Sequence, residues 1–228
     1  MRYYKIGKAW EPEIIGVKDG LAQADLIEEK TDDYREIKDF FYGQTYWDRK
    51  DFLPTKEFIF KYIKLRKNAK VTDLLSFAPH LLGIDFVLSS KVKRLLNGLD
   101  LNNNHFFATN LFDFNGHVIH EQYFVLYTIY FGFETVNFKK SVFFSGDDQL
   151  GHKQYHNFET WRNWEDYWDR PDHEFVKAEK IVIAEKHPGD YIKTRLGGPF
   201  ISERLLDRWT SFGISGFVQL NDQTIEFE

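Results

Sequence analysis

The chain contains no cysteine among its 228 residues. Disulfide bridges, thiolate nucleophiles and zinc sites built on cysteine are therefore excluded. An excess of positive charge is also lacking, because 30 Lys and Arg stand against 35 Asp and Glu, for a net charge of −5. Since a nucleic-acid-binding protein needs a basic face to displace counterions, we expect no nucleic acid as partner.

Long apolar runs are missing as well. No stretch approaches the roughly 18 uninterrupted apolar residues of a membrane-spanning helix. The richest run, residues 122–133, is shorter and has the pattern of a strand. The first 16 residues, MRYYKIGKAWEPEIIG, lack the apolar core of a secretory signal peptide. We therefore expect no membrane partner and a cytoplasmic location.

Aromatic residues, by contrast, are abundant: 23 Phe, 12 Tyr and 6 Trp make up 18% of the chain. With 43% hydrophobic and 29% charged residues, the composition is that of a globular protein. Aromatic rings stabilise cores, and exposed Tyr and Trp dominate binding hot spots. Because no Pro/Gly/Ser-rich linker interrupts the chain, we expect a single compact domain over 1–228, with 1–150 and 151–228 as its possible subregions.

The hydrophobic pattern predicts an α+β fold, mostly antiparallel sheet with a few short amphipathic helices packed on it. Strands are predicted over 2–6, 58–65, 83–90, 105–114, 117–131, 141–145 and 180–186. A final hairpin is predicted over 216–228, with its turn at Asn221 and Asp222. Helices are predicted over 90–99, 158–169 and 203–212, with a helical or turn segment over 71–80. We interpret 187–198 as a loop, 133–155 as largely irregular, and 10–55 as a polar excursion holding one short helix.

Two segments share a pattern. PFISERLLDRWTSFGISGF (199–217) parallels DFVLSSKVKRLLNGLDLNN (85–103): in each, an apolar strand ends at a serine, Ser89 or Ser202, that can cap an amphipathic helix. Gly213 is suited to end the second helix. The apolar face of that helix, predicted to face the core, consists of Leu205, Leu206, Trp209 and Phe212. Because strand–Ser–helix is a common pattern, chance similarity is the alternative to a repeated strand–Ser–helix–strand unit.

The second of these segments carries a family resemblance. Its motif is I-S-E-R-L followed by G-I-x-G-F, formed by Ile201, Ser202, Glu203, Arg204, Leu205, Gly213, Ile214, Gly216 and Phe217. It resembles the ending of bacterial immunity proteins from polymorphic toxin systems, and Tyr3-Tyr4 fits the usual start of that family. The resemblance implies a small intracellular protein that binds and neutralises a cognate toxin domain without catalysis. Since this chain is acidic, we expect that domain to present a basic surface.

Residues that could carry chemistry are few. His152 and His156 have the i, i+4 spacing of helical metal ligands, but their segment is a poor helix and lacks the glutamate of zinc hydrolases. We expect a polar loop there, with no metal and no cofactor. An enzyme with a His/Asp site near 117–156 stays open as the alternative function. Its candidate groups are His117, His120, Glu121, Asp147, Asp148, His152 and His156.

Two segments combine aromatic and acidic residues and are the predicted partner-binding sites. The first comprises Tyr42, Tyr46, Trp47, Asp48 and Asp51. The second comprises Trp161, Trp164, Glu165, Asp166 and Trp168, whose tryptophans share one helical face. Ordinary packing is the alternative for both segments, as a core stripe in the second. If the aromatic residues instead served self-association, the protein would be a scaffold subunit, which is a third possible function.

Overall fold

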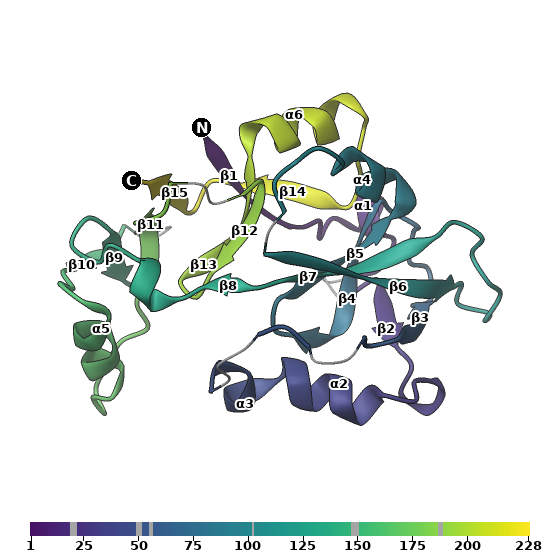
Figure 1. The fold of residues 1–228 in the computed structure, drawn as a ribbon, viewed down its shortest axis with the longest axis horizontal. Helices are drawn as coiled ribbons and strands as arrows, with labels where there is room; N and C mark the ends of the chain where they lie inside the picture. Colours follow the sequence, from purple (N-terminus) through teal and green to yellow (C-terminus); the bar gives the residue numbers. More distant parts are fainter. Residues whose placement is uncertain (19–21, 49–51, 55–56, 102, 147–150, 187–188) are drawn as a thin grey trace.

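β-Strands dominate the protein, whose computed structural model is drawn in Figure 1. Most strand pairs are antiparallel, and short helices pack on the sheets, which confirms the predicted α+β class. The structure describes residues 1–18, 22–48, 52–54, 57–101, 103–146, 151–186 and 189–228. Within that part of the chain, none of the helices has the length and apolar composition that crossing a bilayer requires.

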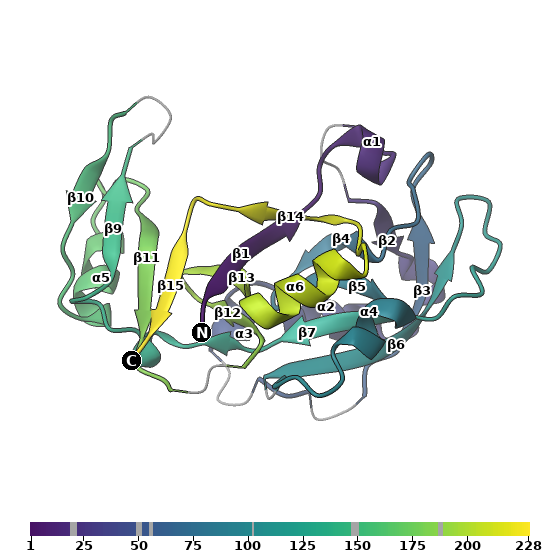
Figure 2. The ribbon, with the colours of Figure 1, turned by 90° about the horizontal axis from the view of Figure 1, so that it is seen from above.

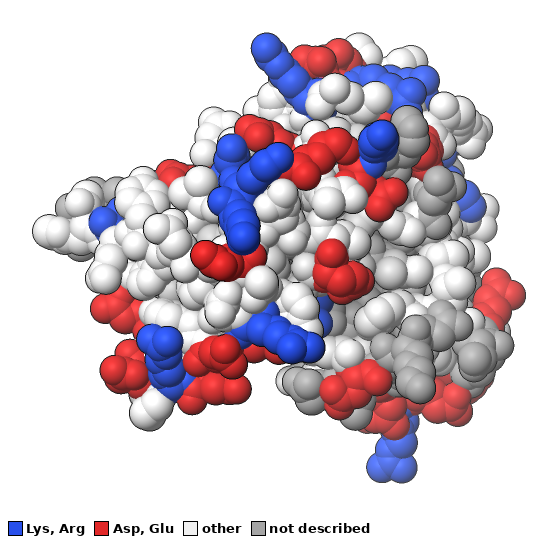
Figure 3. All heavy atoms as spheres, turned by 60° about the vertical axis from the view of Figure 1, so that its left-hand side comes forward, with Lys and Arg blue, Asp and Glu red and all other residues white. Residues whose placement is uncertain are grey.

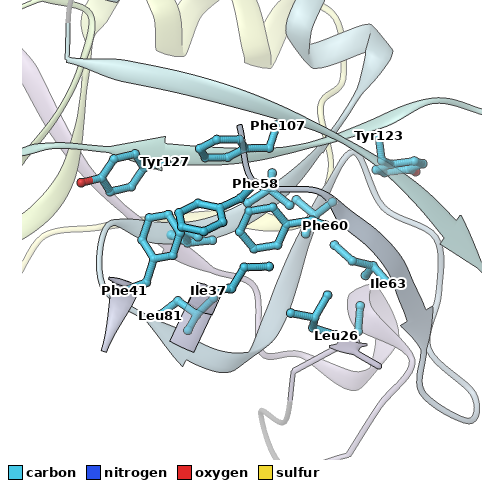
Figure 4. Packing of buried hydrophobic residues seen from close by; sticks show 14 of the residues in the cluster. Leu26, Ile37, Phe41, Phe58, Phe60, Ile63, Leu81, Phe107, Tyr123 and Tyr127 are labelled. Carbon is cyan, nitrogen blue, oxygen red and sulfur yellow. The ribbon is translucent and has the colours of Figure 1, made fainter. Parts of the chain in front are cut away.

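Six strands between residues 24 and 128 close into a barrel. In spatial order they are β2 (Ala24–Leu26), β3 (Phe60–Leu65), β6 (Asn104–Phe112), β7 (Tyr123–Thr128), β5 (Ile84–Ser89) and β4 (Leu74–Leu81). Aromatic rings fill the space that the strands enclose, as Figure 4 shows. The ring of Phe41 lies 5.0 Å from that of Tyr127, and the ring of Phe60 lies 5.3 Å from that of Phe107. This packing accounts for much of the aromatic content.

The segment predicted as an irregular excursion over 10–55 is more ordered than expected. Besides β2 it contains α1 (Pro12–Ile15), a 3₁₀ turn η1 (Glu28–Lys30), α2 (Tyr34–Phe41) and α3 (Gly43–Trp47). Helix α2 buries Ile37, Phe40 and Phe41 on one face. That face closes the underside of the barrel in Figure 1. The polar face of α2 dominates its composition, which is why the sequence suggested a loop.

The N-terminal strand lies among strands from the end of the chain. β1 (Tyr3–Lys8) occupies a five-stranded sheet of order β14-β1-β13-β12-β8. Its neighbours are β14 (Phe217–Leu220) and β13 (Gly197–Ser202), and both pairings are antiparallel. The remaining strands of this sheet are β12 (Tyr191–Thr194) and β8 (Tyr130–Phe131). β12 lies in the segment predicted as a loop over 187–198, so that prediction was wrong.

A second sheet of four strands forms the far end of the molecule, at the left of Figure 1. Its order is β10 (Gln154–His156), β9 (Val142–Ser145), β11 (Lys177–Ile183) and β15 (Thr224–Phe227). A 3₁₀ turn, η2 (Phe133–Thr135), leads into this end, and α5 (Trp161–Trp168) packs on it. β9 was the only strand predicted within 133–155, and β10 was missed because its three residues are too short for a hydrophobic pattern.

The structure corrects two more predictions. Residues 71–80, predicted as helix or turn, contain most of β4, which pairs with β5 in the barrel. The final hairpin does not form: β14 pairs with β1, whereas β15 crosses to the four-stranded sheet and pairs in parallel with β11. Figure 2 shows the two strands diverging. Asp222, at the expected turn, instead accepts a hydrogen bond of 2.7 Å from Lys5 of β1.

The suspected repeat is present in the sheets. In the barrel, four strands lie side by side in the order β4, β5, β7 and β6, and each adjacent pair among these four is antiparallel. Helix α4 (Ser90–Leu95) follows β5. Strands β12, β13, β1 and β14 lie in the same relative order, again antiparallel, and α6 (Glu203–Ser211) follows β13. The N-terminal strand β1 thus takes the place in the second unit that β7 takes in the first.

The helix start is built alike in both units. Ser89 caps α4 by accepting the Val92 N–H at 3.3 Å, and Ser202 caps α6 by accepting the Leu205 N–H at 3.3 Å. The predicted caps are therefore confirmed. The backbone N–H of Ser89 donates to the carbonyl of Asp73 at 2.8 Å, and that of Ser202 donates to the carbonyl of Asp190 at 2.9 Å.

Each cap is tied to a carboxylate and a cation. The hydroxyl of Ser89 donates to Asp73 at 3.1 Å, and that of Ser202 donates to Asp190 at 2.5 Å. Two residues beyond each serine stands a basic side chain that pairs with the same carboxylate. Lys91 lies 3.4 Å from Asp73, whereas Arg204 donates two hydrogen bonds to Asp190, one from Nε and one from Nη2.

A tyrosine opposite each cap completes the match. Tyr123 pairs with Ser89 across the sheet, and Tyr3 pairs with Ser202. Each phenol donates to the carbonyl just before the aspartate of its unit, Tyr123 at 3.2 Å and Tyr3 at 2.8 Å. Burial is the main cause that raises the pKa of both phenols, that of Tyr3 to about 12. The two units therefore share the serine cap, the carboxylate, the cation and the tyrosine.

The two units also exchange a contact. The backbone N–H of Asp100, just beyond α4, donates to Asp190 at 2.8 Å. The backbone N–H of Ser215, just beyond α6, donates to Asp73 at 3.1 Å. Each aspartate is therefore held by the chain that leaves the other unit's helix. The helices lie next to each other, and Arg208 of α6 donates to the carbonyl of Leu95 in α4 at 3.1 Å.

The core face of α6 was predicted with one error. Leu205 and Trp209 are fully buried, as expected, but Phe212 is 60% exposed. Phe212 is the residue after the last turn, and the chain reverses at Gly213, whose φ is +59°. Ile214 then enters the core in its place.

The repeat offers a matched pair of substitutions. Asp190→Asn should lower the free energy of unfolding by about 3 kcal/mol, because a fully buried carboxylate loses its pairing with an arginine fork. Asp73→Asn should cost about 1 kcal/mol, since its lysine contact is longer and partly exposed. Urea unfolding of both variants measures the difference, and equal losses would contradict the greater importance of the Asp190 pair.

Acid should weaken the same interaction. Burial alone would raise the pKa of Asp190, but the hydrogen bonds from Arg204, Ser202 and the backbone of Asp100 lower it overall. A lowered folded-state pKa stabilises the protein above the unfolded value of about 4, and this stabilisation disappears as the pH falls through the folded-state pKa. The difference in unfolding free energy between wild type and Asp190→Asn should therefore shrink from pH 5 toward pH 2. A constant difference would exclude this linkage.

Candidate functional site

The first predicted segment is only partly at the surface. Tyr42 is 58% exposed and Asp48 is exposed, so both could meet a partner. Tyr46, however, is fully buried, and its hydroxyl lies 3.0 Å from that of Tyr127 inside the barrel. Tyr46 therefore belongs to the core and cannot contact a partner. Asp51 lies outside the described residues.

Trp47 stands at the boundary between core and surface. Its ring packs edge-on against Tyr130 at 5.0 Å, and it is half-buried. The guanidinium carbon of Arg195 lies 4.4 Å from the centre of the same ring. Trp47 thus supports a basic group that comes from the end of β12, far away in sequence.

The second predicted segment forms α5, which starts with a capping box between Thr160 and Asn163. Its tryptophan stripe divides between core and surface. Trp164 is buried, with its ring 5.1 Å from Phe143, and Trp168 is half-buried. Trp161 in the first turn is 37% exposed. The prediction of a shared face holds for packing, but Trp164 is core and is unavailable to a partner.

The surface around α5 is acidic. Between 159 and 174 the sequence has six carboxylates, all exposed, and only two arginines. The carboxylates are Glu159, Glu165, Asp166, Asp169, Asp172 and Glu174. Exposed rings stand on the same end of the molecule, namely Tyr155 on β10 and Phe175 before β11. Figure 3 shows acidic side chains gathered over this end, at its lower left. We call residues 154–175 the α5 surface.

A groove of about 800 Å³ separates α5 and the four-stranded sheet from the five-stranded sheet. Aromatic rings line part of it, and the other described side chains of its wall include three cations, one carboxylate and one amide. These rings and polar groups include Trp164, Trp168, Phe175, Lys5, Lys177, Arg195, Asp222 and Gln223.

Arg195 lies against Trp47 of the first predicted segment and near Glu165 of the second. Its guanidinium carbon lies 4.4 Å from the ring centre of Trp47 and 4.3 Å from that of Phe133. Burial lowers the pKa of Arg195, while Glu165 of α5 and Glu134 partly offset this effect. Sequence reasoning missed Arg195, because nothing in the segment TRLGG shows that this exposed arginine lies against Trp47 and Phe133.

Histidine chemistry has one geometric candidate. The Nε2 atom of His156 lies 2.8 Å from the hydroxyl oxygen of Ser145, and that hydroxyl donates to Glu174 at 2.5 Å. In a catalytic triad the carboxylate orients the histidine, whereas here it contacts the serine. Ser145 is 1% exposed, so a substrate cannot reach its oxygen. The three residues instead tie β9, β10 and the chain before β11 together.

The described members of the other proposed His/Asp groups do not form a site. His117 is 79% exposed and lies 3.1 Å from its neighbour Asp113. Asp147 and Asp148 lie outside the described residues. Across the described ranges no three His, Asp or Glu side chains are grouped to hold a metal ion.

Comparison of the chain with models of known protein families gave no match, and comparison with curated proteins gave none either. The candidate site therefore rests on the geometry of the α5 surface and of the groove beside it.

Two tryptophans of α5 test which side of the helix is structural. Trp164→Ala should lower the free energy of unfolding by about 3 to 5 kcal/mol, because it leaves a cavity among Phe143 and Phe158. Trp161→Ala should cost less than about 1 kcal/mol, since its ring is partly in water. Thermal and urea unfolding measure both, and a large loss for Trp161→Ala would place its ring in the core.

Proposed function

We propose that this protein is an immunity protein, which binds a cognate bacterial toxin domain and neutralises it by occupying its surface. The resemblance of the segment from Ile201 to Phe217 to the ending of such proteins motivates the proposal. In this role no residue of the chain need be catalytic, and the protein acts in the cytoplasm of the cell that makes the toxin.

The observation that carries the proposal is the α5 surface. Exposed rings, Tyr155, Trp161 and Phe175, stand among six exposed carboxylates on one end of the molecule. Aromatic side chains anchor interfaces, whereas surrounding charges set the association rate and the choice of partner. A toxin domain with a basic surface would be attracted by these carboxylates and held by the rings.

The first segment adds a smaller contribution. Tyr42 and Asp48 are exposed. Trp47 packs against Arg195, and Arg195 lines the groove beside α5. A partner that covers the α5 surface and crosses the groove would meet Arg195, which lies over the ring of Trp47. The rings of Tyr46 and Trp164 support these surfaces from within.

Co-expression with the toxin domain encoded beside its gene tests the role directly. The proposal expects that the wild-type chain restores growth of cells that make the toxin domain and that the two proteins co-purify. If the chain neither protects the cells nor binds the domain, the immunity function is excluded.

Substitutions then locate the interface. Trp161→Ala should weaken binding at least about thirtyfold if its ring is an anchor, since hot-spot truncations cost about 2 kcal/mol or more. Asp166→Asn should mainly slow association and flatten its salt dependence. Phe212→Ala is the matched control, because it removes an exposed ring from α6, away from the α5 surface. Calorimetry and stopped-flow measurements with properly folded variants give these values, and wild-type affinity for Trp161→Ala together with unchanged kinetics for Asp166→Asn would move the interface elsewhere.

A further inference from the structure

Arg195 has unused hydrogen-bonding capacity. A guanidinium group carries five N–H donors, yet within the described ranges that of Arg195 donates no hydrogen bond and forms no ion pair. The nearby carboxylates of Glu134 and Glu165 influence its charge without pairing with it. Arg195 is exposed, so its free donors face water at the groove wall, and the rings of Trp47 and Phe133 hold the group in position.

Two further polar atoms of the groove residues lack partners. Among the described residues, the indole N–H of Trp168 and the amide oxygen of Gln223 are buried and make no hydrogen bond. Gln223 itself is well fixed, because its amide nitrogen donates to the carbonyls of Ala178 at 2.9 Å and Leu196 at 3.0 Å. Leaving buried polar groups unpaired costs free energy, and such groups call for an explanation.

We propose that this groove binds a carboxylate carried by a peptide segment of a partner protein, with Arg195 as the group that pairs with it. The planar guanidinium fork matches a carboxylate through two parallel hydrogen bonds. Lys177, which also lines the groove, adds positive charge. The rings of Trp168 and Phe175 provide an apolar wall for the side chain beside the carboxylate.

The surroundings favour a peptide carboxylate over a phosphate group. Glu134 and Glu165 stand close enough to influence Arg195, and they disfavour a dianion more than a monoanion. Lys5 adds no free charge, because it is paired with Asp222 at 2.7 Å. This carboxylate site belongs to the groove alone and does not require the partner to be a toxin.

A pair of small probes tests the site. N-acetylphenylalanine carries a carboxylate, a peptide group and a ring, whereas N-acetylphenylalaninamide lacks only the negative charge. Titrations followed by NMR of the indole N–H groups should shift the Trp168 signal, which is assigned by its loss in Trp168→Phe. The acid should bind at least about tenfold more tightly than the amide, as expected for a charge-assisted hydrogen-bonded pair.

Variants identify the group responsible. Arg195→Gln should abolish the difference between acid and amide, and Glu165→Gln should strengthen binding of the acid by removing a nearby negative charge. Arg162→Gln is the matched control, because Arg162 is an exposed arginine of α5 that does not line the groove. It should leave both affinities unchanged.

Three results would overturn the proposal. These are equal binding of acid and amide by the wild-type protein, a preserved difference in folded Arg195→Gln, and displacement of the acid by inorganic phosphate at equal concentration. If Arg195→Gln does not fold, Glu165→Gln decides: unchanged affinity for the acid excludes Arg195 as its partner. Because neither probe is a toxin, a negative result here leaves the test of immunity by co-expression independent.

Discussion

The buried carboxylate of Asp190 is the interaction on which most of the architecture depends. It receives the hydroxyl that caps α6, the guanidinium of Arg204 and a backbone N–H from the chain that leaves α4. One side chain thus fixes a helix start, a strand start and the junction between the two repeated units. Asp73 does the same in the first unit with a weaker cation, so the two networks bind each unit to the other.

This cross-linking explains how the ends of the chain reach their places. Because β1 fills in the second unit the position that β7 fills in the first, the five-stranded sheet needs the N-terminus before it is complete. The chain then passes from β14 of that sheet to β15 of the four-stranded sheet, which keeps the two sheets adjacent along the groove. The groove is therefore a consequence of how the sheets are connected, and its wall combines residues from several distant segments.

Surface and groove present opposite charge chemistry. The α5 surface offers carboxylates and exposed rings, whereas the groove beside it holds a fixed arginine without an ion pair in the described part of the chain. A partner with a basic face and one projecting carboxylate would satisfy both. Such complementary charges on adjoining surfaces favour specificity, because a partner lacking either feature leaves desolvated polar groups unpaired.

The sequence by itself determined the features that depend on near neighbours: the α+β class and the caps at Ser89 and Ser202. Helix period and capping act over three or four residues, so they are visible in a short stretch of chain. Only the tertiary structure decided that β14 and β15 part, that Phe212 is exposed, that Tyr46 and Trp164 are core, and that Arg195 meets Trp47. The physical reason is that strand partners and burial are set by contacts between residues far apart in the chain, where local propensity has no influence.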